Sequence, residues 1–312
     1  MLRTPLYTYG IICSALTAFA ANSILCRYAL KPITLEAHTL EPSILEQGPL
    51  GVNALNTAAI DPISFTLIRL FSGAAILLLL IFLRRKKSAV RIKPSKSNRL
   101  GAFYLTFYAI TFSLAYITLD TATGALILFG TVQLCMISVA LLKGQRLNQR
   151  EWIGYSIAFS GFLLLTLPHV TAPSAFGLVL MIIAGVGWAF YTLNGKESTE
   201  PLTDTMINLC IASLFMTPIG LVLFLLPDFS LHITLNGALA AIASGALASG
   251  IGYAIWYTAL PLITTTQAAT AQLLVPIIAA IGGIVLLGES ISLLLVIAGA
   301  IMLGGIYLLV RK

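Results

Sequence analysis

Ten apolar stretches, each about 20 residues long and almost free of charge, follow one another from Tyr7 to Val310. An α-helix rises about 1.5 Å per residue, so about 20 apolar residues cross the roughly 30 Å hydrocarbon core of a bilayer. Backbone groups in lipid must be satisfied internally, which favours helices over open strands. The pattern predicts an all-α integral membrane protein with ten transmembrane helices. We place them at residues 7–30, 62–83, 100–119, 121–142, 151–168, 175–195, 202–226, 237–260, 264–287 and 291–310.

Composition supports this interpretation. The chain of 312 residues is 58% hydrophobic and only 9% charged, whereas a soluble domain carries about 25% charged residues. Too few polar side chains remain to face water on all sides, which excludes a soluble globular protein. All four cysteines lie inside apolar stretches without metal-type spacing, so we interpret them as buried structural thiols.

The net charge of +7 is unevenly distributed. If the N-terminus is cytoplasmic, all of the 18 basic residues except Arg27, Lys31 and Arg69 fall in cytoplasmic segments, many of them in the linker 84–99. The positive-inside rule therefore predicts a multi-pass protein of the inner (plasma) membrane with both termini in the cytoplasm. This distribution argues against nucleic-acid binding and leaves anionic lipid headgroups as a secondary partner of the linker.

Two features of the first half leave alternatives. A cleaved signal peptide is disfavoured, because the first apolar run continues as far as Arg27. Residues 32–59 form the longest predicted outer segment and contain three prolines and three glutamates. This segment is either a solvated loop or a partial cover of the outer mouth.

The two halves of the chain resemble each other at sparse positions. One shift along the sequence takes Gly144 to Gly288 and also takes Gly161 to Gly305. Five spans per half is an odd number, so the second half would run opposite to the first, as in many secondary transporters. We therefore divide the chain into a first repeat at 1–168, with the insertion 32–59, and a second repeat at 169–312.

Residues 252–260 read GYAIWYTAL, residues 272–276 read QLLVP, and residues 287–289 read LGE. These motifs resemble the EamA-type permeases of the drug/metabolite transporter superfamily. In the first half, Asn22 with Arg27 and the run 60–62 resemble the start of the family's pattern. The resemblance implies ten helices in two inverted five-helix repeats, movement of small metabolites that is often outward, and a cavity lined by helices 1, 3, 4, 6, 8 and 9. The first half departs from the second, with Val132 and Gln145 in place of Pro276 and Glu289.

Arg69 is the most informative polar residue, since it lies close to the centre of the second span. Charged groups deep in a membrane are expensive and usually face the bundle interior. One interpretation is an anchor for a substrate carboxylate or phosphate. The other, which we favour at this stage, is an ion pair with Asp61 or Asp120, or a bond to helix carbonyls. Arg27, near the outer end of the first span, can extend to the membrane interface.

Amides and aromatic rings form a second group of candidates. Amides can line a polar cavity or join helices by hydrogen bonds, and amphipathic rings suit a small organic solute or anchor at the headgroups. The candidate substrate-binding residues are Asn22, Tyr108, Gln133, Trp188, Tyr191, Tyr253 and Gln272.

A third group is predicted to gate or support the structure. Pro276 removes a backbone hydrogen bond and frees the carbonyl of Gln272, which could supply a hinge. No Asp or Glu lies near a span centre, which argues against a buried-carboxylate proton relay. Proton coupling would have to use Asp61, Asp120 or Glu289 at the outer mouth.

The sequence therefore predicts a secondary transporter that moves a small metabolite or amino-acid-like solute by alternating access. The phosphate-binding loop pattern fails, because position 190 holds Phe rather than Gly. We expect no cofactor, no metal and no enzymatic activity. The alternative is a membrane scaffold or membrane enzyme without transport activity, and a homodimer remains open.

Overall fold

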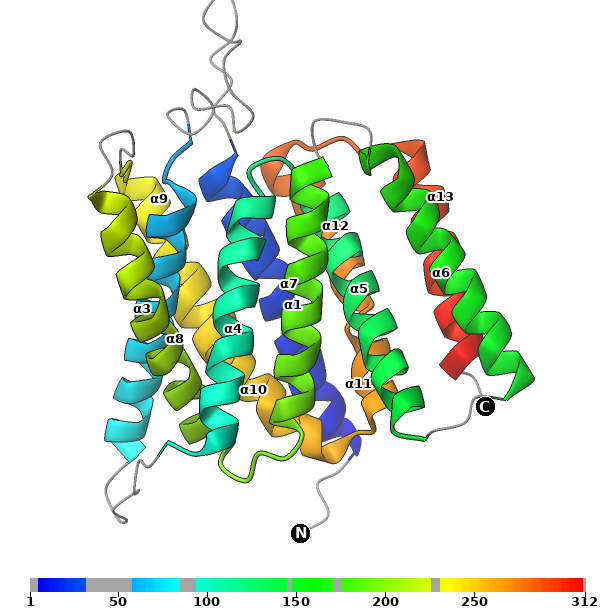
Figure 1. Ribbon diagram of the computed structural model, residues 1–312, viewed down its shortest axis with the longest axis horizontal. Coiled ribbons are helices and arrows are strands. Elements are labelled where there is room, and N and C mark those ends of the chain that lie inside the picture. Colours follow the sequence, from blue (N-terminus) through cyan, green and yellow to red (C-terminus); the bar gives the residue numbers. More distant parts are fainter. Residues whose placement is uncertain are drawn as a thin grey trace, which may run out of the picture.

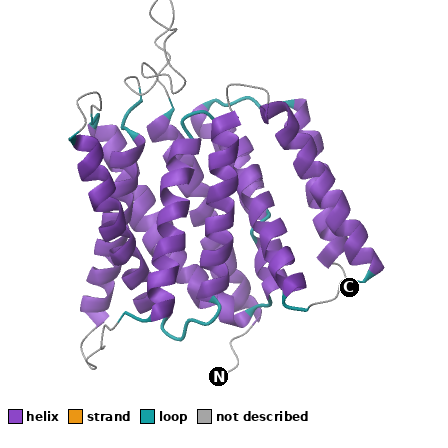
Figure 2. Ribbon diagram, in the orientation of Figure 1, coloured by secondary structure: helices purple, strands orange, loops and turns teal. Residues whose placement is uncertain are grey.

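The protein is built from helices. The computed structural model describes residues 5–31, 58–84, 94–144, 148–170, 175–225 and 231–310. Within these ranges β pairing is limited to one isolated antiparallel bridge between Ile60 and Ile233, and Figure 2 shows long helices joined by short loops. The helical elements, in chain order, are α1 (Pro5–Leu30), α3 (Pro62–Arg84), α4 (Lys96–Ala115), α5 (Thr121–Leu142), α6 (Gln149–Val170), α7 (Ala175–Gly195), α8 (Pro201–Phe224), α9 (Leu235–Ala243), η2 (Ser244–Ile251), α10 (Gly252–Ala259), η3 (Leu260–Leu262), α11 (Thr265–Ala271), α12 (Leu274–Leu287) and α13 (Leu293–Val310).

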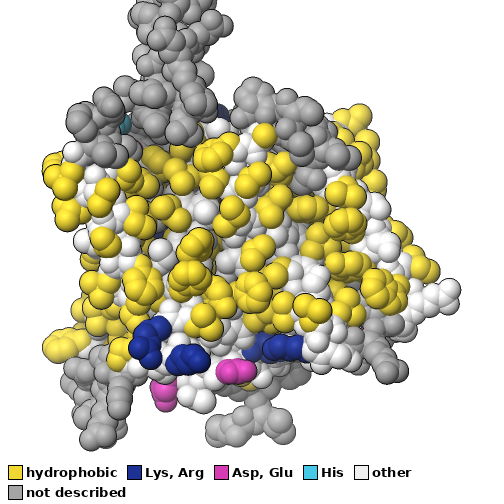
Figure 3. All heavy atoms as spheres, viewed as in Figure 1, with side chains coloured by type: hydrophobic (Ala, Val, Ile, Leu, Met, Phe, Trp, Pro, Cys, Tyr) yellow, Lys and Arg dark blue, Asp and Glu magenta, His cyan; other side chains and the backbone are white. Residues whose placement is uncertain are grey.

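The surface identifies a membrane protein. Among the described residues, seven helices are long and apolar enough to cross a bilayer, and Leu293–Gly305 is a shorter apolar helix. Large apolar side chains such as Phe82, Val222 and Val285 are exposed. Figure 3, drawn from the same side as Figure 1, shows a broad belt of hydrophobic side chains, with Lys and Arg side chains along the lower edge of the belt. An exposed apolar area of this extent matches a lipid-facing surface.

Two predicted spans are interrupted. The eighth consists of α9, the π-helix η2 and α10 in direct succession. The ninth breaks at Gln272 and Leu273 into α11 and α12. The Val275 N–H donates to the Gln272 carbonyl at 3.1 Å, which is a three-residue rather than a four-residue turn. In a regular helix the residue at position 276 would donate its N–H to the Gln272 carbonyl. Pro276 has no N–H, and its ring would clash with that carbonyl, so the helix breaks at this turn.

The helices pack in a flat bundle (Figure 1). α6 and α13 pair with each other at one end of the view. In the rest of the bundle, α3 packs against η2 and α8, α4 against α7, and α1 against η2, α10 and α12. α1 begins and α13 ends towards the lower edge of Figure 1. We call this edge the terminal face and the upper edge the opposite face.

The four cysteines are free thiols with different exposure. Cys26 is buried, as predicted, and Cys135 and Cys210 are partly buried. Cys13 is exposed, so the prediction of four buried thiols was wrong for this residue. An apolar run in a membrane helix has a lipid-facing side as well as a packed side, and hydrophobicity alone does not distinguish them.

Some of the sequence predictions concern residues outside this description. The predicted outer segment is described only at positions 58 and 59, and residues 85–93 of the basic linker are not described. The observed third helix begins at Lys96 and ends at Ala115, four residues earlier at each end than the predicted span. A capping box between Ser95 and Asn98 fixes this start.

Candidate functional site

A buried polar and aromatic cluster occupies the centre of the bundle, around Arg69 of α3. Arg69 is only 1% exposed. Its Nε donates to Ser249 Oγ at 2.9 Å, and its Nη2 donates to the hydroxyls of Tyr253 and Tyr108 at 2.6 and 3.2 Å. Its Nη1 has no hydrogen-bond partner among the described residues. The guanidinium therefore lies between α3, α4, η2 and α10.

The expected ion pair of Arg69 is not formed. In the described part of the chain, ion pairs involve Arg27 and no other arginine, and no helix carbonyl accepts from Arg69. Instead, its guanidinium carbon lies 5.2 Å from the centre of the Tyr108 ring and 5.0 Å from that of Phe112. The prediction of a partner in Asp61 or Asp120 was wrong, because other groups occupy both carboxylates.

Asn22 of α1 joins the same cluster. Its Nδ2 donates to the hydroxyl of Tyr108 at 3.1 Å and to that of Tyr253 at 3.4 Å. Its Oδ1 accepts from the hydroxyl of Ser244 in η2. One amide thus connects the first helix with α4 and the eighth span, and its donor and acceptor groups are both used.

Aromatic rings form a wall beside these polar groups. Trp188 of α7 lies with its ring centre 4.8 Å from Tyr253, 5.0 Å from Tyr108 and 5.4 Å from Tyr191. Phe19 of α1 meets the Trp188 ring edge-on at 5.0 Å. The geometry is that of favourable tilted and edge-to-face pairs. The predicted candidates Tyr108, Trp188, Tyr191 and Tyr253 are therefore brought together.

Gln272 lies in the break between α11 and α12 and is hydrogen-bonded to Trp188 of this wall. The Trp188 Nε1–H donates to Gln272 Oε1 at 2.6 Å, and Gln272 Nε2 donates to the Ala268 carbonyl at 3.2 Å. Both ends of the amide are satisfied, and the side chain is 1% exposed. Trp188 and Gln272 therefore connect α7 with the interrupted ninth span.

The π-helix explains why the eighth span supplies so many of these groups. A π-turn widens the helix locally and often occurs at functional sites. Ser244 and Ser249 both belong to η2 and bond to Asn22 and Arg69, respectively. A Cβ at Gly245 would clash with the Arg69 carbonyl oxygen. Gly245 therefore lets η2 approach α3 closely enough for Ser249 to contact Arg69. Neither serine was predicted, since hydroxyls are common in membrane helices.

Two buried amides have no hydrogen-bond partner among the described residues. Gln133 of α5 and Asn208 of α8 are each 1% exposed, and neither their oxygens nor their nitrogens are satisfied. Buried polar groups are normally paired, so these two unpaired amides are candidate contacts for a polar ligand. Gln133 was predicted. Asn208 was missed, although a lone amide in an apolar run carries the same signal.

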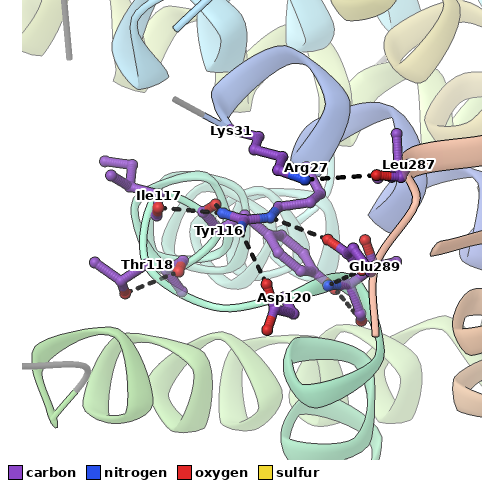
Figure 4. A network of polar contacts seen from close by, with 10 residues as sticks. Arg27, Lys31, Tyr116, Ile117, Thr118, Asp120, Leu287 and Glu289 are labelled. Carbon is purple, nitrogen blue, oxygen red and sulfur yellow. Dashed lines mark hydrogen bonds and ion pairs between the residues drawn. The ribbon is translucent and has the colours of Figure 1, made fainter. Parts of the chain in front are cut away.

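A second charged cluster surrounds Arg27 in the last turn of α1, near the opposite face (Figure 4). Arg27 Nη2 lies 3.0 Å from Asp120 Oδ1, and Arg27 Nε lies 3.2 Å from Glu289 Oε1. Arg27 Nη1 also donates to the carbonyls of Tyr116 and Ile117 at 2.9 and 3.2 Å. The sequence prediction that Arg27 extends to the interface was wrong, because the chain brings two carboxylates to it and the residue is only 7% exposed.

Glu289 and Asp120 differ in exposure within this network. The Glu289 side chain is 6% exposed and that of Asp120 is 57% exposed. Glu289 also accepts from the Thr121 N–H at 3.0 Å through its second oxygen. Arg27 thus ties α1 to the α4–α5 turn and the α12–α13 turn, and water screens its pair with the buried Glu289 less than its pair with the exposed Asp120.

Asp61 has a separate structural role. Its Oδ1 accepts from the backbone N–H groups of Ile63 and Ser64 at 3.0 and 2.8 Å, and its Oδ2 accepts from the His232 N–H at 3.2 Å. These bonds cap the start of α3 and hold it against the segment before α9. The carboxylate is therefore occupied with backbone donors rather than with Arg69.

A polar pocket of about 310 Å³ opens on the terminal face. Its lining includes Asn98, Asn194 and Asp204 from the helix ends at this face, and also Asn208 and Tyr257, which are each 1% exposed. The Tyr257 ring lies 4.9 Å from that of Tyr191, which in turn lies 6.0 Å from Tyr253. A chain of three tyrosine rings therefore separates the pocket from Arg69.

Other cavities lie away from the central cluster. A pocket of about 180 Å³ beside Asp120 and Glu289 is lined by Thr123 and Ser292. An apolar groove of about 360 Å³ runs between α5, α12 and α13 and contains Pro276. No group of three His, Cys, Asp or Glu side chains suited to a metal occurs in the residues that the structure covers.

Lys196 connects two turns at the terminal face. Its Nζ donates to Thr265 Oγ1 at 2.8 Å and to the Ile263 carbonyl at 3.3 Å. Partial burial lowers the pKa of Lys196 from its ordinary value, and the positive charge of Lys143 acts in the same direction. The α7–α8 turn is thereby fastened to the segment before α11.

Comparisons with known proteins agree with this picture. The model of the EamA-like transporter family matches residues 175–311. An uncharacterized protein of Pseudomonas aeruginosa is 41% identical over 95% of this chain and 91% of its own length. An uncharacterized transporter of Archaeoglobus fulgidus is 29% identical over 81% of this chain and 89% of its own. A crystal structure of a protein 16% identical matches with a TM-score of 0.64 over 98% of both chains, which shows a shared fold.

Proposed function

This chain belongs to the EamA-like transporter family, and we propose that it is a secondary transporter for a small organic solute. In this proposal ten helices span the inner membrane, with the terminal face in the cytoplasm. Two inverted repeats, at 1–168 and 169–312, alternate access to a site between them. The proposal involves no catalytic step and no cofactor.

The helix contacts support an internal two-fold relation. We match α1 with α7, α3 with α8, α4 with the eighth span, α5 with the ninth and α6 with α13. Under this matching, the contact of α4 with α7 corresponds to the contact of α10 with α1. The contact of α5 with α7 corresponds in the same way to the contact of α12 with α1. The pairs α3 with α8, α5 with α12 and α6 with α13 map onto themselves. Five helices per half make this relation an inversion.

The glycines that match between the halves behave alike. Gly144 and Gly288 both adopt positive φ, of 87° and 63° respectively, just after α5 and α12. A Cβ at Gly161 would lie 2.7 Å from the Met302 nitrogen, and one at Gly305 would clash with the Ala158 nitrogen. Both glycines thus permit the same close crossing of α6 and α13. Sparse identities that keep equal backbone roles favour a true repeat.

The observation that carries the transport proposal is the buried cluster where the two halves meet. Asn22, Arg69 and Tyr108 come from the first repeat, and Trp188 and Tyr253 come from the second. Polar groups deep in a bilayer are expensive and mark solute pathways. Because both repeats contribute, any rocking of one against the other reshapes the site.

The two faces supply the gates in this scheme. The Arg27, Asp120 and Glu289 network closes the opposite face, whereas the polar pocket opens the terminal face as far as Tyr257. The structure then corresponds to a state that is closed on the outside and partly open to the cytoplasm. Transport requires the tyrosine chain and the Arg27 network to open in alternation, one towards each face.

Counterflow in liposomes tests the proposal. Purified protein is reconstituted into vesicles that hold a broad metabolite mixture, and mass spectrometry follows the loss of each solute. We expect selective counterflow that depends on the protein. Protein-containing vesicles that retain every solute as well as empty vesicles do would contradict it.

Thiol labelling tests alternating access separately. Asn208→Cys lies at the inner end of the pocket, and Ser97→Cys, at its rim, is the matched control. A membrane-impermeant thiol reagent applied at the terminal face should label both, after subtraction of the wild-type signal. A transported solute should change the labelling rate of the Asn208→Cys variant but not that of the Ser97→Cys variant. Equal rates with and without that solute in both variants would count against alternating access.

A further inference from the structure

The charge of Arg69, at the centre of the bundle, has no counter-ion among the described residues. Arg69 is 1% exposed, and no carboxylate of the described residues forms an ion pair with it. An uncompensated buried charge carries a large desolvation cost. The flanking rings of Tyr108 and Phe112 supply cation–π attraction, which is weaker than the attraction of a buried counter-charge. These contacts are too weak to balance the charge.

The hydrogen bonds of this arginine are also incomplete. Its Nε and Nη2 have hydroxyl partners, but its Nη1 has none among the described residues. The Tyr108 hydroxyl accepts from Arg69 Nη2 at 3.2 Å and from Asn22 Nδ2 at 3.1 Å, which fills its two lone pairs. Its own proton is therefore available to a further acceptor. Two neighbouring groups, the guanidinium of Arg69 and the phenol of Tyr108, thus each keep a donor without an acceptor among the described residues.

We propose that these two donors bind a carboxylate and that the solute is a small monocarboxylate with an apolar body. This inference rests on the proposed transport function and names its substrate class. A carboxylate accepts charge-assisted hydrogen bonds and supplies the missing negative charge. Phosphate monoesters carry about −1.5 to −2 charges at neutral pH, but Arg69 is the single cation among the described contacts of the cluster.

The surroundings define the rest of the solute. Trp188, Tyr253 and Phe19 form an aromatic wall beside the donors, with ring centres 4.8 to 6.0 Å apart. Such a wall suits an apolar body.

Entry follows from the pocket on the terminal face. The pocket ends at Tyr257, and the rings of Tyr191 and Tyr253 continue from it towards Arg69. Asn208, which belongs to the pocket's inner lining, has an unsatisfied amide. Movement of the tyrosine rings would place the solute carboxylate on the guanidinium, with its body against Trp188.

A matched binding series tests the charge requirement. Detergent-solubilised protein is titrated with monocarboxylates of two to ten carbons, phenylacetate among them, and with the amide of each. A third series contains the α-amino acids that carry the same apolar groups as these monocarboxylates. Binding is read from the melting temperature and from tryptophan fluorescence. We expect at least one carboxylate to bind roughly 10- to 100-fold more tightly than its amide, as expected for charge-assisted hydrogen bonds.

The variant Arg69→Gln should abolish this discrimination, so that acid and amide bind equally weakly. Arg69→Lys should keep the charge preference with lower affinity, because a point charge replaces the planar fork. Arg99→Gln, at the exposed start of α4, is the matched control and should bind as the wild type does. If Arg69→Gln does not purify, Tyr108→Phe tests the second donor and should weaken carboxylate binding several-fold.

The outcomes separate this inference from the transport proposal. No preference for any acid over its amide, or a preference that survives Arg69→Gln, overturns the carboxylate site. Counterflow of neutral solutes alone would overturn it while leaving transport intact. Arg69-dependent binding without counterflow of the bound acid would keep the site and contradict transport.

Discussion

The two buried arginines of this protein have opposite surroundings. Arg27 has two carboxylate partners and two backbone carbonyls within 3.2 Å. Arg69 has three hydroxyl partners and two aromatic rings, but no carboxylate among the described residues. Each is less than a tenth exposed. Burial alone therefore does not decide what a membrane arginine does.

The difference lies in whether the charge is balanced before a ligand arrives. The Arg27 network is neutralised by its own chain, so its formation stabilises one closed state of the opposite face. Arg69 lacks that compensation, and its surroundings are polar enough to hold the guanidinium without neutralising it. A balanced charge suits a gate, and an unbalanced one suits a binding site.

The largest expected effect is on stability, at Arg27. Arg27→Gln leaves the buried Glu289 carboxylate without its cation, and loss of one partner of a buried pair costs about 3–5 kcal/mol. The free energy of unfolding in detergent should fall by this amount. Arg99→Gln should stay within about 0.5 kcal/mol of the wild type. Equal stability of the Arg27→Gln and Arg99→Gln variants would contradict the inference that the Arg27 network stabilises the protein.

The second largest effect is expected on the transport rate, when Arg69 is replaced. Arg69→Gln removes an uncompensated charge, so we expect unfolding to need as much free energy as before or more. The initial counterflow rate should nevertheless fall at least about 100-fold, or about 2.7 kcal/mol. A loss of stability as large as that of Arg27→Gln would show that the central arginine, too, is chiefly structural.

A smaller effect is expected from the hydroxyls that hold Arg69. Tyr253→Phe deletes its shortest hydrogen bond, of 2.6 Å, and leaves the bonds to Tyr108 and Ser249. Counterflow should fall about 10-fold, which corresponds to about 1.4 kcal/mol. Tyr9→Phe, on the 66% exposed Tyr9 of α1, is the matched control and should transport normally. Unchanged transport by Tyr253→Phe would mean that the hydroxyl does not position the guanidinium.

The smallest effect is expected at the exposed partner of Arg27. The Asp120 side chain is 57% exposed, and exposed pairs contribute only about 0–1 kcal/mol. Asp120→Asn should therefore lower stability much less than Glu289→Gln. Double-mutant cycles with Arg27→Gln measure both couplings. A coupling to Asp120 that equals the coupling to Glu289 would contradict the ranking drawn from burial.

Much of the candidate site was predictable because depth in the membrane is a local property. Asn22, Tyr108, Trp188 and Tyr253 each stand out as polar or amphipathic residues inside an apolar run, and the structure brings them into contact. Gln133 remains a prediction, since no described residue bonds to its amide. The serines of η2 were missed, because no signal in the sequence reports a π-turn.

The partners of the charged residues were not predictable in the same way. Asp61, Asp120 and Glu289 were assigned together to the outer mouth. Asp120 and Glu289 meet at Arg27, whereas Asp61 caps α3. Arg27 and Glu289 are 262 residues apart, and Arg69 and Tyr253 are 184 apart. Pairing over such separations depends on how helices pack and not on any local pattern.

By itself, the sequence determined that the chain is a helical membrane protein and which polar residues lie at depth, because runs of apolar side chains of bilayer length act through a local transfer free energy. It also determined the break beside Pro276, because proline acts on its own helix turn. The tertiary structure alone decided which arginine is neutralised. That choice depends on a few ångströms between side chains of different helices, and only packing sets those distances.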